Sequence, residues 1–205
     1  MNVLMINGSP RGNGNTAIAL REMKNVFAQE GIEVTELNVG AKAIRGCIAC
    51  NKCAELGKCV FDDAVNEAAP LLAKADGVVV ASPVYYASAN GNLISFLDRL
   101  FYSSRCDLTM KVGASVVCAR RGGCSATFDE LNKYFTISGM PLASSQYWNS
   151  IHGRLPGEAE QDEEGKQTMR ALARNMAFLM KSITLGKEAY GLPEKEPRVA
   201  THFIR

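Results

Sequence analysis

Short apolar runs that alternate with helix-patterned segments constrain this chain more than any other feature. The runs Val3–Ile6 and Gly77–Ala81 are continuous in apolar character, which is typical of strands buried on both faces, and Val112–Val117 is expected to be a further strand. Segments with helical spacing of apolar residues follow these runs, and strand and helix are expected to alternate five times. This alternation predicts an α/β domain with a parallel sheet and right-handed crossovers.

The other elements follow from the same spacing and from glycine and proline stop signals. We expect helices over 16–29, 63–74, 93–100, 125–137 and 163–185, a strand over 32–37 near a sheet edge, and a fifth strand between Pro141 and Trp148. Residues 151–162 are expected to be irregular. We therefore predict one domain over 1–186, with a cysteine-rich insertion at 39–62 and a C-terminal tail over 187–205 that is extended or disordered.

Length and charge exclude several classes of protein. The 205 residues fit one sizeable domain, and a net charge of +2 without a long Lys/Arg run argues against a nucleic-acid binder. No apolar stretch reaches the roughly 18 residues of a membrane span, and Met1–Asn7 lacks the basic start of a signal peptide. We expect a cytoplasmic protein without nucleic-acid or membrane partners, whose seven cysteines serve as metal ligands, redox groups or core residues.

The loop after the first strand has the composition of a phosphate site. Backbone N–H groups and the dipole of the next helix both point at such a position, and glycines let the backbone curve around an anion. Hydrogen bonds or charge are offered by Ser9, Arg11, Asn13, Asn15 and Thr16. The loop lacks the Gly-Lys-Ser/Thr ending of a Walker A motif, and it fits a dinucleotide fingerprint poorly. The alternative is a glycine- and asparagine-rich turn that only caps a helix.

Five segments carry a resemblance to a known family. They are Asn7–Thr16, Ser82–Tyr86, Leu93–Arg99, Arg120–Gly123 and Gln161–Gly165. In order and spacing they resemble the NADPH-dependent FMN reductase family over nearly the whole chain. The resemblance implies a three-layer flavodoxin-like sandwich, with a five-stranded parallel sheet of order 2-1-3-4-5 and helices on both faces. It also implies that the first loop binds the FMN phosphate and that the protein is a homodimer or homotetramer.

Two later loops are candidates for contact with the flavin ring. The resemblance places the segment Pro83, Val84, Tyr85 and Tyr86 against the isoalloxazine, where an aromatic side chain can cover a ring face. Arg120, Arg121 and Gly122 could stabilise the negative charge of reduced flavin or hold the phosphate of a nicotinamide cofactor. The alternatives are tyrosines that pack or face a subunit, and a solvated basic turn. No catalytic side chain is predicted because the flavin carries the chemistry, and His152 is expected to be structural.

Cys47, Cys50, Cys53 and Cys59 form a C-x2-C-x2-C-x5-C cluster within the insertion. Soft thiolates in this number select iron–sulfur clusters or zinc. The pattern resembles the compact cysteine motif of iron–sulfur flavoproteins, which implies a [4Fe–4S] cluster that passes electrons to FMN. Structural zinc and free, redox-sensing thiols are the alternatives.

The predicted function is that of an FMN-dependent NAD(P)H oxidoreductase, which passes a hydride or electrons to a flavin, a quinone or another small acceptor. The alternative is an iron–sulfur flavoprotein that relays single electrons from a ferredoxin-like donor through the cluster to FMN. A thiol sensor with a structural flavin and a protein that binds NAD(P) alone are two further hypotheses. The sequence leaves open the acceptor and the choice between NADH and NADPH.

Overall fold

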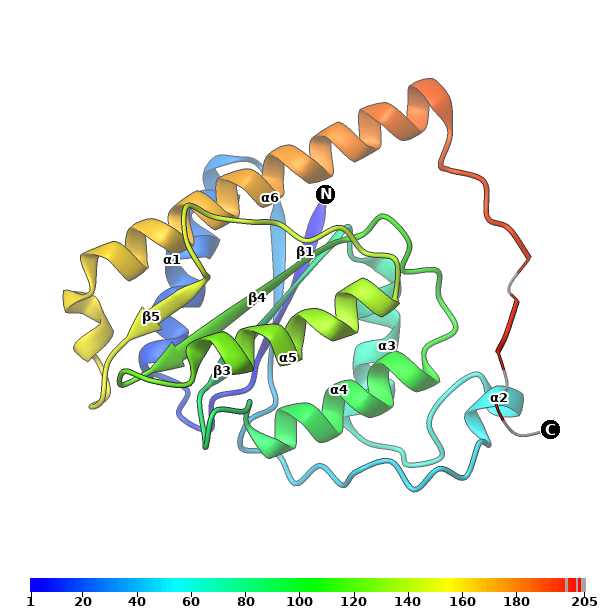
Figure 1. The fold of residues 1–205 in the computed structure, drawn as a ribbon, viewed down its shortest axis with the longest axis horizontal. Helices are drawn as coiled ribbons and strands as arrows, with labels where there is room; N and C mark the ends of the chain where they lie inside the picture. The colour runs from blue at the N-terminus through cyan, green and yellow to red at the C-terminus, as the bar shows by residue number, and fades with distance from the viewer. Residues whose placement is uncertain (198, 202, 204–205) are drawn as a thin grey trace.

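A computed structural model describes residues 1–197, 199–201 and 203 of the chain. Its centre is a parallel sheet of five strands in the order β2-β1-β3-β4-β5, drawn in Figure 1. The strands are β1 (Asn2–Asn7), β2 (Glu33–Asn38), β3 (Gly77–Pro83), β4 (Val112–Ala119) and β5 (Ser150–His152). This order and direction confirm the predicted flavodoxin-like fold class.

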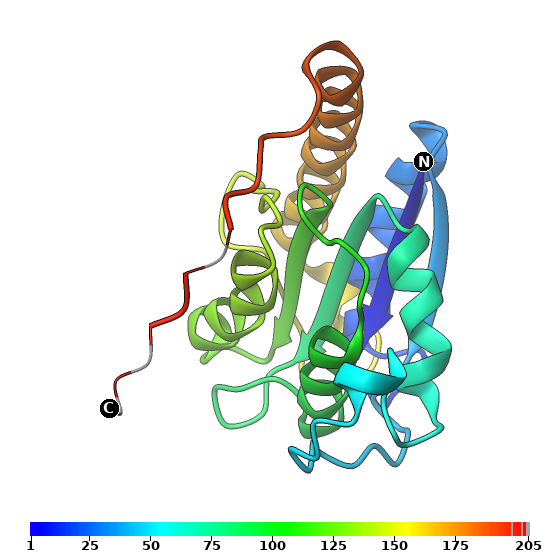
Figure 2. The ribbon, with the colours of Figure 1, turned by 90° about the vertical axis from the view of Figure 1, so that its right-hand side faces the viewer.

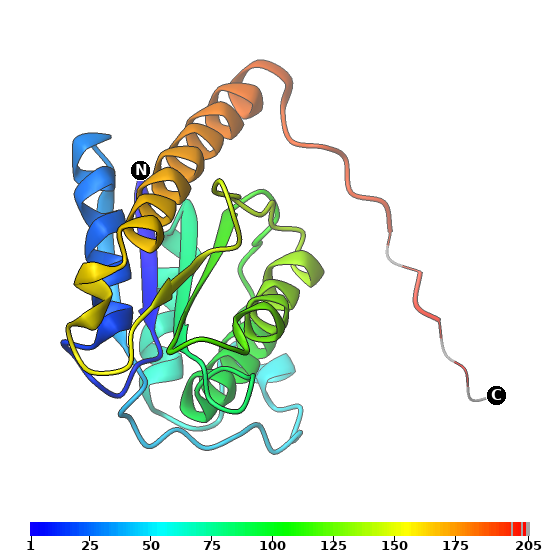
Figure 3. The same cartoon turned by 60° about the vertical axis from the view of Figure 1, so that its left-hand side comes forward.

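Helices cover both faces of the sheet, which gives three layers (Figures 1 and 3). The helices are α1 (Asn15–Gln29), α2 (Cys53–Leu56), α3 (Ala64–Lys74), α4 (Gly91–Ser103), α5 (Cys124–Ile137) and α6 (Glu163–Tyr190), with a 3-10 turn η1 (Glu158–Gln161). One apolar core joins α1 and α6 to the sheet, and a second core joins α3, α4 and α5 to the opposite face. Two-sided burial explains why the central strands β1, β3 and β4 consist mostly of apolar residues.

The predicted fifth strand is wrong in position. The segment 141–148 touches the sheet through a single bridge between Leu142 and Gly113, and regular pairing with β4 begins only at Ser150. Asn149 explains why regular pairing starts at Ser150. Its side-chain amide donates to the Ser115 carbonyl at 3.0 Å and fixes the chain at the sheet edge. The expected irregular stretch 151–162 consequently contains most of β5 and all of η1.

The last helix is longer than predicted. The sequence predicts that it ends at residue 185, before Gly186, but α6 continues to Tyr190 and ends at Gly191, whose φ is 75°. A glycine inside a helix costs only about 1 kcal/mol, which the neighbouring turns tolerate. Beyond α6 the chain leaves the body of the protein as an extended segment (Figures 2 and 3). Positions 198, 202, 204 and 205 of the predicted tail lie outside the described residues.

In the described part of the chain, none of the helices combines the length and the apolar character that crossing a bilayer requires.

Candidate functional site

The loop between β1 and α1 is held from below by the sheet. The Gly8 N–H donates to the Ala81 carbonyl at 2.8 Å, and the Asn7 side chain accepts from the Ser9 N–H at 2.9 Å. The N-cap residue of α1 is Gly14, which carries no side chain that could cap the helix. The first N–H groups of α1 therefore face a curved backbone loop, as an anion site requires.

Most of the predicted FMN contacts line one hollow at the carboxyl ends of the strands. The hollow brings together Ser9, Arg11, Asn15, Thr16, Pro83, Val84, Tyr85 and Arg120, and it adds Gly14, Cys118, Ala119, Gly153 and Arg154. Four predicted residues do not line it. Asn13 borders a neighbouring depression, Tyr86 is fully exposed, and Arg121 and Gly122 lie outside the hollow. The roles assigned to individual residues remain predictions.

Asn15 is already engaged within the protein. Its amide nitrogen donates to the Leu155 carbonyl at 3.0 Å, and its oxygen accepts from the Ala159 N–H at 3.1 Å. Gly153 approaches so closely that a Cβ there would lie 2.5 Å from the Asn15 amide nitrogen. Asn15 thus ties the start of α1 to the segment after β5, which forms the far wall of the hollow.

The segment after β3 turns sharply at Tyr86 and Ala87. Both residues have positive φ, at 52° and 59°, and the backbones of Tyr85 and Ser88 exchange two hydrogen bonds across them. Two consecutive residues with positive φ are costly for side chains other than glycine. Glu130 of α5 holds the turn in place by accepting from the Ala89 N–H at 2.8 Å and from the Ser88 hydroxyl.

Two cysteines and a histidine lie beside the hollow. Burial raises the pKa of Cys118 to about 12 and also raises the pKa of Cys124. Cys124 Sγ lies 3.9 Å from Nε2 of His152, whose backbone N–H donates to the Asp162 carboxylate at 2.7 Å. Both cysteines are therefore neutral thiols near pH 7, and His152 is anchored by its backbone.

The cysteine-rich connection begins at the loop between β1 and α1, which is called the phosphate loop after its predicted role. Gly40 packs so closely against this loop that a Cβ would lie 2.2 Å from the Gly8 carbonyl oxygen and 2.3 Å from the Ser9 carbonyl carbon. Asn92, near the start of α4, donates to the Gly40 carbonyl at 3.0 Å. From there the connection runs along α4 to the opposite end of that helix, as Figure 1 shows.

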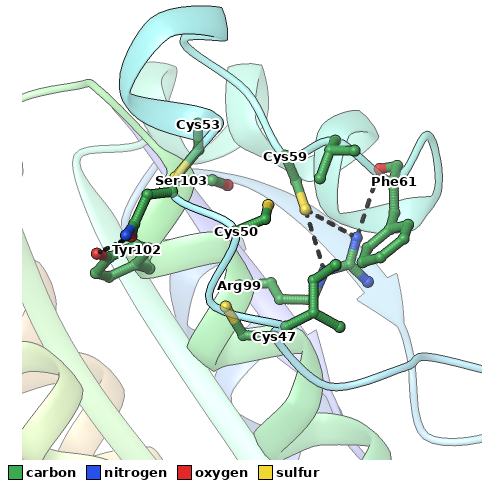
Figure 4. A pocket seen from close by; sticks show the side chains of 11 residues that line it. Cys47, Cys50, Cys53, Cys59, Phe61, Arg99, Tyr102 and Ser103 are labelled. Atoms are coloured by element: carbon green, nitrogen blue, oxygen red, sulfur yellow. Dashed lines mark hydrogen bonds between the residues drawn. The ribbon is translucent and has the colours of Figure 1, made fainter.

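All four predicted cysteine ligands line a single small cavity next to the last turns of α4 (Figure 4). Cys47 and Cys50 are exposed, Cys53 is buried at the start of α2, and Cys59 is half-buried. The rest of the lining is mostly apolar and includes Ile48, Val60 and Phe61. Within the described residues, no three His, Cys, Asp or Glu side chains lie close enough together to hold one metal ion.

Two sulfur atoms in this cavity accept hydrogen bonds. The Ala49 N–H donates to Cys47 Sγ at 3.4 Å, and the Arg99 guanidinium donates to Cys59 Sγ at 3.2 and 3.3 Å. Donors directed at sulfur stabilise thiolates more than neutral thiols. The donor set therefore fits a metal or cluster that takes thiolate ligands.

The sequence interpretation assigned no role to two side chains that fix Cys59. Asn66 of α3 pairs with the Cys59 backbone, accepting from its N–H and donating to its carbonyl, both at 2.9 Å. Arg99 of α4 binds its sulfur. In the sequence, Arg99 is marked only by its place in Leu93–Arg99, one of the segments that resemble the family. A single arginine among the apolar residues of a helix forms no motif that would point to a site.

Comparison with known proteins identifies the family of the chain. The family described as NADPH-dependent FMN reductase matches residues 1–154. The chain belongs to this family. The FMN reductase family is one of flavoproteins, and the observed fold and strand-end hollow agree with that membership.

Two archaeal relatives of this FMN reductase family member are named iron-sulfur flavoprotein. One, MJ1083 from Methanocaldococcus jannaschii, is 34% identical over 195 residues, covering 89% of this chain and 99% of the relative. The other, from Methanosarcina thermophila, is 28% identical over 193 residues, covering 92% of this chain and 100% of the relative.

Solved structures share the fold at low sequence identity. RosB with a bound 8-demethyl-8-formylriboflavin-5'-phosphate intermediate superposes with a TM-score of 0.71 at 15% identity, covering 100% of this chain and 94% of RosB. An archaeal flavodoxin gives a TM-score of 0.55 at 16% identity, covering 86% of this chain and 99% of the flavodoxin. These neighbours support the flavodoxin-like architecture of the FMN reductase family member.

Proposed function

We propose that this flavoprotein relays single electrons between a [4Fe–4S] cluster at Cys47, Cys50, Cys53 and Cys59 and an FMN at the carboxyl ends of β1, β3 and β4. The observation that carries the proposal is that four cysteines, 13 residues from first to last in the sequence, line one cavity in which two sulfurs accept hydrogen bonds. The names and full-length coverage of the two archaeal relatives support it.

The strand-end hollow fits FMN by its chemistry. The open N-terminus of α1, with Ser9, Arg11 and Thr16 beside it, would hold the phosphate, and Pro83, Val84 and Tyr85 would border the ring. When bound, FMN accepts and donates electrons one or two at a time. The neutral Cys118 thiol adds no charge to the wall of this hollow, so Arg11, Arg120 and Arg154 give it a positive balance.

The cysteine cavity offers the ligands of a cluster. In a cubane cluster each of four thiolates binds a different iron atom. All four cysteines line this one cavity, which supports a shared cluster. Zinc, which is also bound by four thiolates around one centre with Zn–S distances of about 2.3 Å, is the alternative that metal analysis separates.

Helix α4 connects the two sites. Its N-cap residue Asn90 follows the Tyr85–Ser88 turn, and Arg99 faces the cysteine cavity. Eight residues separate Gly91 from Arg99, which is about 12 Å at 1.5 Å per residue. The exposed Cys47 and Cys50 would leave the cluster open to a donor of the ferredoxin class.

A second candidate function is reduction of bound FMN by NADH or NADPH, with transfer to a flavin, quinone or other small acceptor. The family description favours it, and so does the position of Arg120 at the edge of the hollow. Steady oxidation of NADPH or NADH by FMN-loaded protein would support this activity. Oxidation no faster than that by free FMN would dismiss it.

The electron-relay proposal is tested on protein purified without oxygen and loaded with FMN. We expect four iron atoms per chain, as a [4Fe–4S] cluster requires, and broad absorption that dithionite bleaches. The Cys59→Ser variant should lose most of this iron. The Cys106→Ser variant is the matched control, because Cys106 is half-buried and does not line the cavity. One zinc per chain, or no metal in the wild type, would refute the cluster.

A further inference from the structure

Arg99 is a charged side chain inside the protein. It is only 1% exposed and lies on α4 between the cysteine connection and the α3–α4 core. All of its guanidinium contacts come from the segment 45–63. They are two hydrogen bonds to the Asp63 carboxylate at 2.7 and 3.0 Å, two to Cys59 Sγ, and longer ones to the Arg45 and Phe61 carbonyls. The Phe61 ring lies 5.0 Å from the guanidinium.

The geometry divides the guanidinium between two acceptors. Nη1 and Nη2 form a fork on the carboxylate of Asp63, while Nε and Nη2 form a fork on the sulfur of Cys59. Burial opposes a charge on either partner. The two hydrogen bonds between the guanidinium and the carboxylate, at 2.7 and 3.0 Å, compensate for the burial and keep both side chains charged. A buried ion pair next to a single sulfur sets the electrostatic field at that sulfur more strongly than a solvated pair would.

We propose that Arg99 is a positioning residue that orients Cys59 as a thiolate ligand and raises the reduction potential of the cluster bound there, while Asp63 partly offsets this effect. The inference rests on the electron-relay function proposed above. Reduction adds one electron from an external donor, here dithionite, and breaks no bond. The added negative charge is stabilised by the guanidinium and its two N–H groups, and hydrogen bonds to ligand sulfurs are a known determinant of cluster potential.

The two partners give opposite predictions, which a purely structural role would not. The Arg99→Gln variant removes the positive charge next to the sulfur and should disfavour reduction. The Asp63→Asn variant keeps the arginine and removes the opposing negative charge, so it should favour reduction. The Arg99→Lys variant keeps the charge but cannot form both forks, and its potential should lie between those of Arg99→Gln and wild type.

The experiment is a redox titration of the anaerobic, FMN-loaded holoprotein, followed by the electron paramagnetic resonance of the reduced cluster. For Arg99→Gln we expect a decrease of about tenfold in the equilibrium constant for one-electron reduction, which is 59 mV. For Asp63→Asn we expect a shift of similar size in the opposite direction. Iron content and the titration of FMN are measured on the same samples.

Arg105→Gln is the matched control. Arg105 is exposed and donates to the Cys53 carbonyl at 3.3 Å, so it contacts a ligand cysteine without touching a sulfur. Its variant should keep the wild-type potential. If Arg99→Gln does not bind iron, the reduction potentials of Arg99→Lys and Asp63→Asn still test whether Arg99 raises the potential of the cluster.

The outcomes separate the two proposals. Full iron with an unchanged potential in Arg99→Gln, or shifts of the same sign in the Arg99 and Asp63 variants, would overturn the role of Arg99 alone. Absence of iron from the wild type would overturn the cluster, and the role of Arg99 with it.

Discussion

The phosphate loop and the cysteine connection are two irregular segments of similar importance that are built in different ways. The phosphate loop is short, mostly anchored to strand ends, and positioned by backbone hydrogen bonds such as the one from Gly8 to Ala81. The cysteine connection, residues 39–62, is long and largely exposed, and none of its described residues belongs to a strand. Its last cysteine is held by the side chains of Asn66 and Arg99.

This difference shows which interactions hold each of the two segments in its folded conformation. A loop fixed by the sheet is preorganised before any ligand arrives, because its shape follows from the fold. A connection fixed by a few side chains has low local stability, and a bound group would contribute much of its order. Variants and treatments that act on only one of the two segments test this difference.

The largest effect is expected where the two segments touch. In Gly40→Ala the new Cβ would collide with the backbone at Gly8 and Ser9, which cannot move aside as a side chain can. We expect a loss of about 3 kcal/mol in unfolding free energy, at the upper end for overpacking, together with weaker FMN binding. Urea unfolding and fluorescence titration with FMN measure the two effects.

Gly46→Ala is the control for that variant. It lies in the same connection, and its nearest neighbour for a Cβ is the Ser95 hydroxyl at 4.0 Å. Its stability should stay within about 0.5 kcal/mol of wild type, as for most surface changes. Equal losses in both variants would show that the connection does not need its close approach to the phosphate loop.

Removal of the iron of the proposed cluster should affect the cysteine connection and not the phosphate loop. After anaerobic chelation, we expect proteolysis within residues 41–58 to accelerate about tenfold, which corresponds to ~1.4 kcal/mol of local stability. FMN affinity should change little, because the sheet holds the phosphate loop. Limited proteolysis with mass spectrometry and FMN titration of the same sample test this, and a parallel loss of FMN would contradict the separation of the two segments.

Cysteine labelling should follow the same division in iron-free protein. The pKa of Cys118 is raised to about 12, so at pH 8 it is almost entirely protonated and reacts slowly with iodoacetamide. Its reactivity should rise as pH increases toward 12. The exposed Cys47 and Cys50 are accessible to the reagent and serve as the internal reference. Peptide mapping would contradict this picture if Cys118 were labelled as fast as they are.

The smallest effect is expected at the turn after β3. Ala87 has a φ of 59°, which glycine adopts without strain, and its neighbour Tyr86 is equally strained. The Ala87→Gly variant should gain up to about 1 kcal/mol in unfolding free energy. Thermal unfolding measures this gain. A decrease would mean that the alanine methyl group, which lies near the space above Gly123, packs favourably there.

The same difference explains which features of the fold and of the candidate sites can be predicted from the sequence. The strand–loop–helix arrangement at Asn7–Thr16 was predictable because its signals are local: a buried strand, glycines and a helix start. The grouping of the four cysteines around one cavity was indicated by their spacing. Strand β5 was misplaced because Pro141–Ala143 has the apolar character of a strand, whereas the pairing starts after Asn149.

The contacts of Arg99 could not be predicted from local sequence signals. Its partners lie 36, 40 and 54 residues away, at Asp63, Cys59 and Arg45, and no local pattern links them. The side chain of Asn15 shows the same limit, since its contacts with Leu155 and Ala159 are 140 and 144 residues away. Residue types indicate the chemistry expected at these sites, but only the tertiary structure shows which side chains are already hydrogen-bonded within the protein.

Helix α4 carries one last consequence. Arg99 of α4 lies at the cysteine cavity, and the N-cap Asn90 at the other end of the helix follows the Tyr85–Ser88 turn, whose Tyr85 lines the strand-end hollow, so the length of α4 contributes to the separation of the two sites. A change in the length of the segment 41–62 would leave this helical spacing, and the proposed electron path along it, unchanged. Adding or removing residues within α4 would alter both the path length and the angular relation of its two ends.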